Sequence, residues 1–497
     1  MTQYYIINYR FIMSFLLFLI STLTYGQKNQ INVEEFDKKI EALIEAHKAV
    51  GLSVAVVKDN KVIYSKGFGY RDLASKRPVT ENTVFHIASM TKAFSGALLG
   101  ILESENQLSL TDKPSLYIPN FRFYNEKMDN LITIEDLLSH KSGIGNQGSS
   151  IVMFPEKDKL KTVQRLKYLK PEGEIKNSWI YSNIGYTLAG TVAEQVTGKS
   201  WDTNIQERLF APLDMDNSYT TIEAMTQTDN YALGYAMYKG EIKLAPFENY
   251  YSWTPAGAIK SSVKDLTNWM LVWLNNGMFN DAQVIPKEYV KRATTLQNTK
   301  VETYEKDAFL YGEGFGWRLR AWHGHYRFHH GGNTNGFSTV MNLFPFENIG
   351  IVVLTNQKSS LLPYAVSDYI SRKLYGLSDF EFPIIVSDTY QPSTENIPLN
   401  TEKMPTHSIP KYVGTYHAKG FGTIQIIQEG EHLFAVLPTY KFQLIHRNHD
   451  SFYLRGMKGF SGEFDPEFTV QFVTDKDGEI TVLKLYSQRE PVDFFKQ

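Results

Sequence analysis

The sequence predicts an α+β protein, in which an antiparallel sheet is flanked by helices and followed by a small all-β domain. Two β-branched runs flank Asp59 and Asn60 and predict an early hairpin. The stretches "FSTVMNLFP" and "IGIVVLTN" predict two strands much later in the chain, and helical patterns lie in between. We therefore expect the first and last strands of the sheet to be neighbours, with a helical region inserted.

The helices are predicted by apolar spacing and by capping residues. Residues 33–48 place their apolar side chains on one stripe, which is typical of an amphipathic helix. Thr133 with Asp136, and Ser262 with Asp265, have the spacing of helix N-caps. Gly198 and Gly277 are predicted to end the helices that precede them.

Changes in composition and in residue patterning along the chain predict its domains. Residues 1–26 have a basic residue, a short apolar run and a small residue before the expected cut, so we interpret them as a signal peptide. An uncleaved anchor is the alternative. The main domain is predicted at 27–378, and residues 379–410 form a linker with several prolines. Residues 411–497 alternate in short strands and predict a small antiparallel barrel or sandwich.

Composition limits the function classes. The 497 residues carry a formal net charge of −2, with 42% apolar and 21% charged residues, so neither a nucleic-acid binder nor a disordered chain is indicated. The chain has no Cys, which excludes disulfides, thiolate nucleophiles and Cys-ligated metals. With the export signal, this is compatible with a bacterial periplasmic or secreted protein.

A Ser-Lys pair in "HIASMTKAF" is the first candidate for chemistry. Ser89 and Lys92 are three residues apart and share one face if the segment is helical, so the amine can reach the hydroxyl. The pattern S-x-x-K also occurs at Ser261 and at Ser408, and spacing alone therefore does not select the functional pair. We interpret Ser261/Lys264 as helix capping and Ser408/Lys411 as chance.

Two further motifs follow in order. "WIYSNIGY" holds Tyr181 and Asn183, the one Y-x-N pattern in the chain. "HHGGNTNGFS" holds His330, Gly331 and Gly332 immediately before a predicted strand, and glycines there let the backbone approach a ligand closely.

The order Ser-x-x-Lys, Tyr-x-Asn, His-x-Gly resembles the serine β-lactamase and penicillin-binding-protein family, in its class C-like branch with D-aminopeptidases and esterases. The flanks "LLSHKSGI" and "PAGAIKSSVKDLTNWM" are similar as well, and the resemblance covers about residues 35–376. It implies a β-lactamase/transpeptidase-like fold and an acyl-enzyme on Ser89. It also implies an oxyanion site made by the backbone amides of Ser89 and Asn333, beside Gly332. The tail is similar to a small β-barrel domain often appended to such hydrolases.

The residue types suit this chemistry. A serine hydroxyl needs a base, and a lysine serves only when desolvation or nearby positive charge lowers its pKa. A tyrosine phenol can relay the proton to the leaving group. Asn183 can orient Lys92 and hold a substrate amide. We expect catalysis by Ser89, Lys92 and Tyr181, with Asn183, His330, Gly332 and Asn333 on the substrate or the oxyanion, and we expect no cofactor.

One departure from the family pattern bears on the substrate. β-Lactamases and transpeptidases carry Lys in the third motif, where this chain has His330, and a histidine is mostly neutral near pH 7 unless its pKa is shifted. This favours an esterase or a D-amino-acid peptidase or amidase. The alternatives are a class C-like β-lactamase or D-Ala-D-Ala carboxypeptidase, and a catalytically silent binding or sensor protein on the same scaffold. The expected partner is a small-molecule or peptide substrate, cell-wall-derived ones included. The sequence leaves the oligomeric state open, and no membrane span is expected after signal cleavage.

Several other residues are given ordinary roles. Lys141-Ser142-Gly143 resembles a K-[ST]-G motif but precedes Tyr181, so we expect a loop. His140 is expected to be structural. Four histidines fall within residues 323–330, but no carboxylate lies beside them in the sequence, so a metal site is disfavoured.

Overall fold

The computed structural model describes residues 32–145, 153–238, 240–247, 251–300, 307–384, 403–438, 440–456, 468–487 and 490–497. The predicted signal peptide, 1–26, and most of the predicted linker lie outside these residues. Within the described chain, no helix has both the length and the apolar character needed to cross a membrane.

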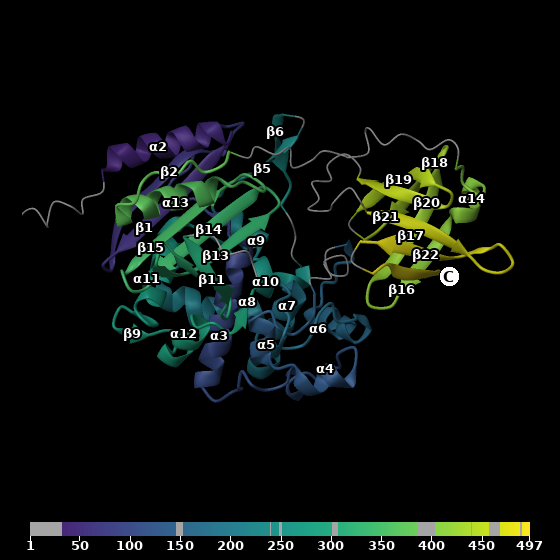
Figure 1. Ribbon diagram of the computed structural model, residues 1–497, viewed down its shortest axis with the longest axis horizontal. Coiled ribbons are helices and arrows are strands. Elements are labelled where there is room, and N and C mark those ends of the chain that lie inside the picture. Colours follow the sequence, from purple (N-terminus) through teal and green to yellow (C-terminus); the bar gives the residue numbers. More distant parts are fainter. Residues whose placement is uncertain are drawn as a thin grey trace, which may run out of the picture.

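A nine-stranded antiparallel sheet forms the centre of the main domain (Figure 1). Its order is β10-β11-β12-β13-β14-β15-β1-β2-β3. The strands are β1 (Gly51–Lys58), β2 (Lys61–Asp72), β3 (Arg77–Pro78), β10 (Asn298–Thr299), β11 (Ala308–Glu313), β12 (Arg318–Trp322), β13 (His325–Thr334), β14 (Phe337–Phe344) and β15 (Ile349–Thr355). β1 pairs with β15, so the predicted meeting of the first and last strands is confirmed. Asp59 and Asn60 both have positive φ at the β1–β2 turn, as the hairpin prediction requires.

Two helices cover one face of the sheet. They are α2 (Val33–Ala46) and α13 (Leu362–Tyr375), and α2 confirms the amphipathic pattern at 33–48. Phe36 and Ile40 of α2 pack with Val54 of β1 and Val366 of α13 in a separate apolar cluster. The burial of this stripe fixes which face of β1 and β15 points away from the remaining helices.

The inserted region supplies the helices on the other face. They are α3 (Thr91–Ser104), α4 (Glu126–Leu131), α5 (Ile134–Leu138), α6 (Lys159–Gln164), α7 (Asn183–Thr197), α8 (Trp201–Ile205), α9 (Ile222–Met225), α10 (Thr254–Gly257), α11 (Val263–Leu274) and α12 (Lys287–Ala293). Thr133 and Asp136 form a complete capping box, and Gly198 ends α7 in the left-handed conformation. Ser262 caps α11, but this helix ends at Leu274, before the predicted Gly277, because Asn275 already leaves the helical conformation.

Short elements complete this region. They are the 3₁₀ helices η1 (Ala88–Met90), η2 (Pro114–Leu116), η4 (Arg165–Tyr168), η6 (Ala211–Leu213) and η7 (Tyr251–Trp253), and the π-helical turn η5 (Gln206–Phe210). Two-stranded pairs are β4 (Phe85–His86) with β7 (Lys260–Ser261), β5 (Gly234–Tyr238) with β6 (Glu241–Ala245), and β8 (Met278–Phe279) with β9 (Ala282–Gln283).

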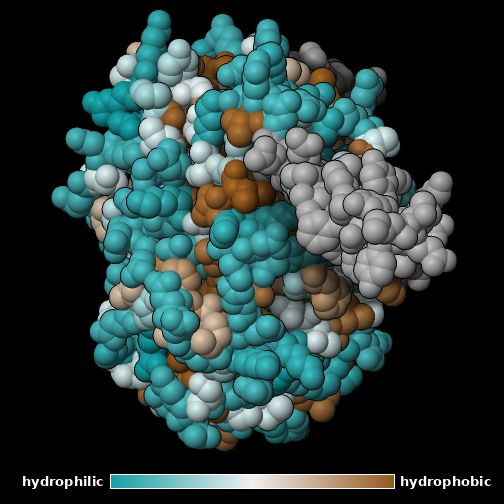
Figure 2. Space-filling view, turned by 90° about the vertical axis from the view of Figure 1, so that its left-hand side faces the viewer, coloured by the Kyte–Doolittle hydropathy of each residue, from teal (hydrophilic) through white to brown (hydrophobic). Residues whose placement is uncertain are grey.

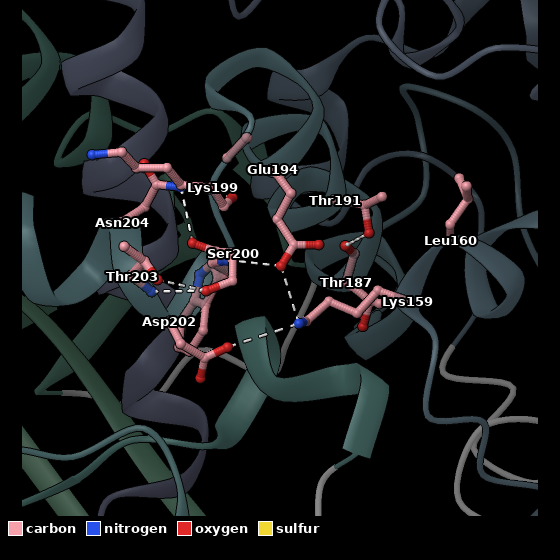
Figure 3. A network of polar contacts seen from close by, with 12 residues as sticks. Lys159, Leu160, Thr187, Thr191, Glu194, Lys199, Ser200, Asp202, Thr203 and Asn204 are labelled. Atoms are coloured by element: carbon pink, nitrogen blue, oxygen red, sulfur yellow. Dashed lines mark hydrogen bonds and ion pairs between the residues drawn. The ribbon is translucent and has the colours of Figure 1, made fainter.

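A polar network ties α7 to its neighbours (Figure 3). The Lys159 Nζ of α6 lies 3.1 Å from Glu194 Oε1 on α7 and 3.9 Å from Asp202 Oδ2 on α8. Glu194 Oε1 also accepts the backbone N–H of Trp201 at 2.7 Å. Because these side chains are largely buried, the network restrains α7, the helix whose first residue is Asn183.

The C-terminal domain is a closed eight-stranded antiparallel barrel, which decides between the predicted barrel and sandwich in favour of the barrel. A short helix, α14 (Ile409–Tyr412), precedes β16 (Gly414–Ala418), β17 (Gly422–Glu429), β18 (His432–Val436), β19 (Lys441–Asn448), β20 (Ser451–Gly456), β21 (Thr469–Thr474), β22 (Ile480–Tyr486) and β23 (Val492–Lys496). Gly430 and Gly478 take positive φ in the turns between β17 and β18 and between β21 and β22.

The barrel packs against the helical region rather than against the sheet (Figure 1). Phe154 is buried between the domains, with its ring centroid 5.5 Å from that of Phe494 and 6.3 Å from that of Phe421. Lys170 and Glu490 form an ion pair at 3.3 Å across the same boundary. The opposite side of the main domain is mostly hydrophilic, with apolar residues in small separate areas (Figure 2).

Candidate active site

The candidate nucleophile lies in a sharp turn between β4 and α3. Ser89 is the middle residue of η1, and Ala88 before it has φ +46°, in the left-handed region. A non-glycine residue there costs about 1–3 kcal/mol, so the surrounding packing must hold it. Ile87 anchors the turn by donating its N–H to Ile259 O at 3.0 Å. This geometry presents the Ser89 side chain, half-buried, ahead of the first turn of α3.

Lys92 is fully buried beneath Ser89. Its Nζ donates to Asn183 Oδ1 at 2.7 Å and to Ala256 O at 2.8 Å, and it lies 3.3 Å from Ser89 Oγ. The first two partners are acceptors only, so they use the two N–H bonds of a neutral amine and leave its lone pair for the serine hydroxyl. Burial, and then the positive charge of Arg318, hold the pKa of Lys92 well below its usual value, while Glu313 acts in the opposite direction.

Tyr181 completes the group from the helical side. Its hydroxyl lies 2.8 Å from Ser89 Oγ, and Lys92 Nζ lies 4.7 Å from the centroid of its ring. The His140 ring packs on the Tyr181 ring at 4.6 Å, and His140 Nδ1 accepts the backbone N–H of Ser182 at 3.2 Å. Burial lowers the pKa of His140, so it stays a neutral acceptor that positions Tyr181, in keeping with its predicted structural role.

Asn183 joins the group because it is the first residue of α7. Ser182 is the N-cap of α7, and its hydroxyl accepts the N–H of Gly185 at 3.0 Å. This cap fixes the first turn of the helix and points the Asn183 side chain at Lys92.

The third motif lies on β13, against η1. A Cβ placed on Gly332 would lie 2.2 Å from Ile87 O and 3.1 Å from Ala88 Cβ, so only glycine allows this approach. Asn333 follows in register with Ser338, whose hydroxyl donates to Asn333 Oδ1 at 2.8 Å. The structure thus brings Ser89, Lys92, Tyr181, Asn183 and the 330–333 segment to one place.

His330 is buried beside this group and differs from a fixed cation. Its Nδ1 contacts Gly331 O at 2.6 Å, which makes Nδ1 the protonated nitrogen, and its buried Nε2 has no hydrogen-bond partner among the described residues. Burial, followed by the charges of Arg318 and Lys92, lowers the pKa of His330 well below its usual value. His330 is therefore neutral at physiological pH and offers an acceptor rather than a positive charge.

Two charged residues at this site were not singled out from the sequence. Arg318 begins β12, and its Cζ lies 5.9 Å from the centroid of the Tyr181 ring. Glu313 ends β11, is buried, and lies 3.4 Å from Arg318 Nε through its Oε1. The alternation Arg318-Leu319-Arg320 was a usable signal for a strand with one cationic face, but nothing in it indicated Tyr181 as a neighbour.

The residues given ordinary roles are also placed. Lys141-Ser142-Gly143 lies in a loop, Gly143 has φ +74°, and Lys141 pairs with Asp136 at 3.6 Å. His325 contacts Glu347 at 2.6 Å, a carboxylate that lies far from it in the sequence. Across the described ranges, no group of three or more histidines and carboxylates is arranged to hold a metal ion.

Comparison with known proteins identifies the family. The family model described as Beta-lactamase matches residues 36–373. The chain belongs to the Beta-lactamase family. A second model, described as Domain of unknown function (DUF3471), matches residues 400–496, which contain the barrel.

Individual relatives agree with this assignment. The chain is 29% identical over 344 residues to Protein flp of Staphylococcus aureus (strain N315), a match that covers 67% of this chain and 65% of flp. It is 25% identical over 431 residues to Unguisins hydrolase ungD' of Aspergillus campestris, covering 80% of this chain and 78% of that protein. The octameric penicillin-binding protein homologue from Pyrococcus abyssi superposes with a TM-score of 0.64 at 23% identity, over 93% of this chain and 100% of that one. This last likeness shows the β-lactamase/transpeptidase-like fold with an appended barrel.

Proposed function

We propose that this member of the β-lactamase-related serine hydrolase family cleaves an ester or amide through an acyl-enzyme on Ser89. The observation that supports this best is the convergence of Lys92 Nζ and Tyr181 OH on Ser89 Oγ, at 3.3 and 2.8 Å. A silent binding protein on the same scaffold has no use for a buried lysine whose pKa is lowered beside a serine hydroxyl.

The proposed reaction begins with proton transfer from the Ser89 hydroxyl to the neutral Lys92 amine, directly or through the Tyr181 phenol. Ser89 Oγ bonds to the substrate carbonyl carbon, and the backbone amides of Ser89 and Asn333 stabilise the oxyanion. The proton passes to the leaving alcohol or amine as its bond to the carbonyl breaks. A water molecule then attacks the acyl ester and releases the acid, which restores Ser89.

The neutral state of His330 supports an esterase or a D-amino-acid peptidase or amidase. A substrate carboxylate next to His330 would meet the lone pair of Nε2 rather than a positive charge. A class C-like β-lactamase or a D-Ala-D-Ala carboxypeptidase is the second candidate, supported by the family assignment and by the fold. For the whole protein we propose export to a periplasm or secretion, on the pattern of residues 1–26, with small molecules or peptides as substrates.

Covalent labelling tests this function directly. A fluorophosphonate should add one adduct to the wild-type protein, seen by intact mass, and none to Ser89→Ala. Lys92→Ala and Tyr181→Phe should each lose about 10²–10⁴-fold in kcat/KM on a short acyl ester, the usual loss when a general base is removed. Unchanged turnover in Ser89→Ala would refute the mechanism. A panel of acyl esters, D-peptides and a chromogenic cephalosporin would then separate the two candidates.

A further inference from the structure

Lys92 and Arg318 both lie close to the ring of Tyr181. Lys92 Nζ is 4.7 Å from the ring centroid, and Arg318 Cζ is 5.9 Å from it. A cation above an aromatic ring is attracted to the π-face, so the Arg318 guanidinium favours this placement of the phenol. Positive charge next to the phenol also stabilises its anionic form and disfavours a second charge on Lys92.

A buried carboxylate holds Arg318 in this position. Glu313 lies at the end of β11, directly across from Arg318 in the β11–β12 pair, and its Oε1 is 3.4 Å from Arg318 Nε. Burial raises the pKa of Glu313 to about 7, although Arg318 opposes this shift. Above this pH the pair is ionised, and Glu313 partly offsets the charge that Arg318 exerts on its surroundings.

The other groups around Lys92 do not supply a fixed charge. Tyr186 of α7 lies with its ring centroid 5.5 Å from Lys92 Nζ, and burial keeps its hydroxyl protonated. His140, on the loop after α5, and His330, on β13, are both held neutral by burial. Asn183 and Ala256 contribute only neutral oxygens. Arg318 and Glu313 are therefore the charged groups that face this lysine from the described residues.

We propose that the Arg318–Glu313 pair is a positioning and tuning element that keeps Lys92 neutral and Tyr181 ready to pass on the serine proton. Arg318 lies beside the Tyr181 ring and acts through Lys92 and Tyr181. Glu313 anchors the guanidinium and limits its effect. The inference rests on the proposed acyl-enzyme function and extends it to the residues that set the working pH.

The pH dependence of acylation tests the pair, because the two residues should move it in opposite directions. With a neutral acyl ester as substrate, kcat/KM rises with pH as Lys92 loses its proton. Lys92 Nζ and Arg318 Cζ lie within about 11 Å of each other, because each is close to the same Tyr181 ring. At an effective dielectric constant near 20, a unit charge at that distance shifts a pKa by about one unit, so Arg318→Gln should move this rise in kcat/KM, the acidic limb, to higher pH by about one unit. Glu313→Gln leaves Arg318 uncompensated and should shift the limb downward.

Two further variants separate charge from packing. Arg318→Lys keeps the charge, so its acidic limb should lie within about 0.3 pH units of the wild-type limb, compared with the shift of about one unit expected for Arg318→Gln. Arg320→Gln removes the same charge two residues along β12, where the guanidinium packs at 5.8 Å on the ring of Tyr311 instead, and should shift the limb less than Arg318→Gln. Thermal unfolding of each variant confirms that it is folded.

An unshifted limb in Arg318→Gln, or shifts of the same sign in both neutralising variants, would overturn the inference. If wild type forms no fluorophosphonate adduct at any pH, the proposed function itself fails. If wild type is labelled but the limbs coincide, only the role of the Arg318–Glu313 pair fails.

Discussion

Gly332→Ala is expected to slow acylation strongly while leaving the fold intact, because the new methyl group meets backbone. The added Cβ would lie 2.2 Å from Ile87 O, whereas carbon–oxygen contacts between packed backbones are about 3.3–3.6 Å. β13 and η1 must therefore separate by about 1 Å, and a displacement of this size costs about 10²-fold in rate when it separates reacting groups. The overpacking should also lower the free energy of unfolding by about 1–3 kcal/mol.

The assay is the second-order rate constant of fluorophosphonate labelling at Ser89, measured with kcat/KM on an acyl ester and with chemical unfolding. Gly478→Ala in the barrel is the matched control, since its new Cβ meets no described atom within 4 Å, while its positive φ of 81° makes the methyl group destabilising. We expect Gly478→Ala to label within about 3-fold of wild type, well inside the 10²-fold loss assigned to Gly332→Ala.

Two outcomes would refute this reasoning. Labelling of Gly332→Ala at the wild-type rate would mean that the close approach of β13 is not needed for acylation. The second outcome is that adding Thr339→Ala restores the labelling rate of Gly332→Ala. The Thr339 hydroxyl lies 2.6 Å from the added Cβ, so such a rescue would place the conflict with a side chain and not with the backbone of Ile87.

Three further predictions concern stability, the barrel and pH. Burial lowers the pKa of Lys260 to about 7, so between about pH 7 and 10 the unfolded state binds more protons than the folded state. The free energy of unfolding should therefore rise with pH by up to about 1.4 kcal/mol per pH unit. Urea unfolding should show this slope in wild type but not in Lys260→Met, and equal slopes in the two proteins would contradict the prediction. Phe154→Ala removes a buried ring between the domains and should cost about 3–5 kcal/mol of packing free energy, which loosens the contact between them. X-ray scattering should then show a larger radius of gyration than for wild type or for the control Phe346→Ala, a residue that is 81% exposed. Labelling at Ser89 should persist in both variants. Because His330 is already neutral, the KM of an acidic ester should not change between pH 6 and 8 through titration of this residue. A pH-dependent KM in wild type that disappears in His330→Asn would contradict this, because it would show that His330 carries a charge.

Local sequence patterns were sufficient for many elements of the fold. The hairpin at Asp59-Asn60 needs two residues with positive φ, and the caps at Thr133 and Ser262 need a side-chain oxygen at a fixed distance along the chain. Such signals depend on neighbours within four residues, so they can be read without the tertiary structure. The end of α11 was misplaced because Gly277 marks the following turn, whereas Asn275 already stops the helix.

The sequence by itself determined the chemical groups of the site and their order, because Ser89-x-x-Lys92, Tyr181-x-Asn183 and His330-Gly331-Gly332 are short motifs with their spacing built in. Only the tertiary structure decided their charge states and their contacts across the chain. Lys92 is neutral because folding buries it near Arg318, and His330 is neutral because burial outweighs any stabilisation of its cation. Arg318 lies on β12, and the packing of the helical region against the sheet places its Cζ 5.9 Å from the ring centroid of Tyr181, more than a hundred residues away in the sequence. Burial and distance arise from packing of the whole chain, and no local pattern encodes them.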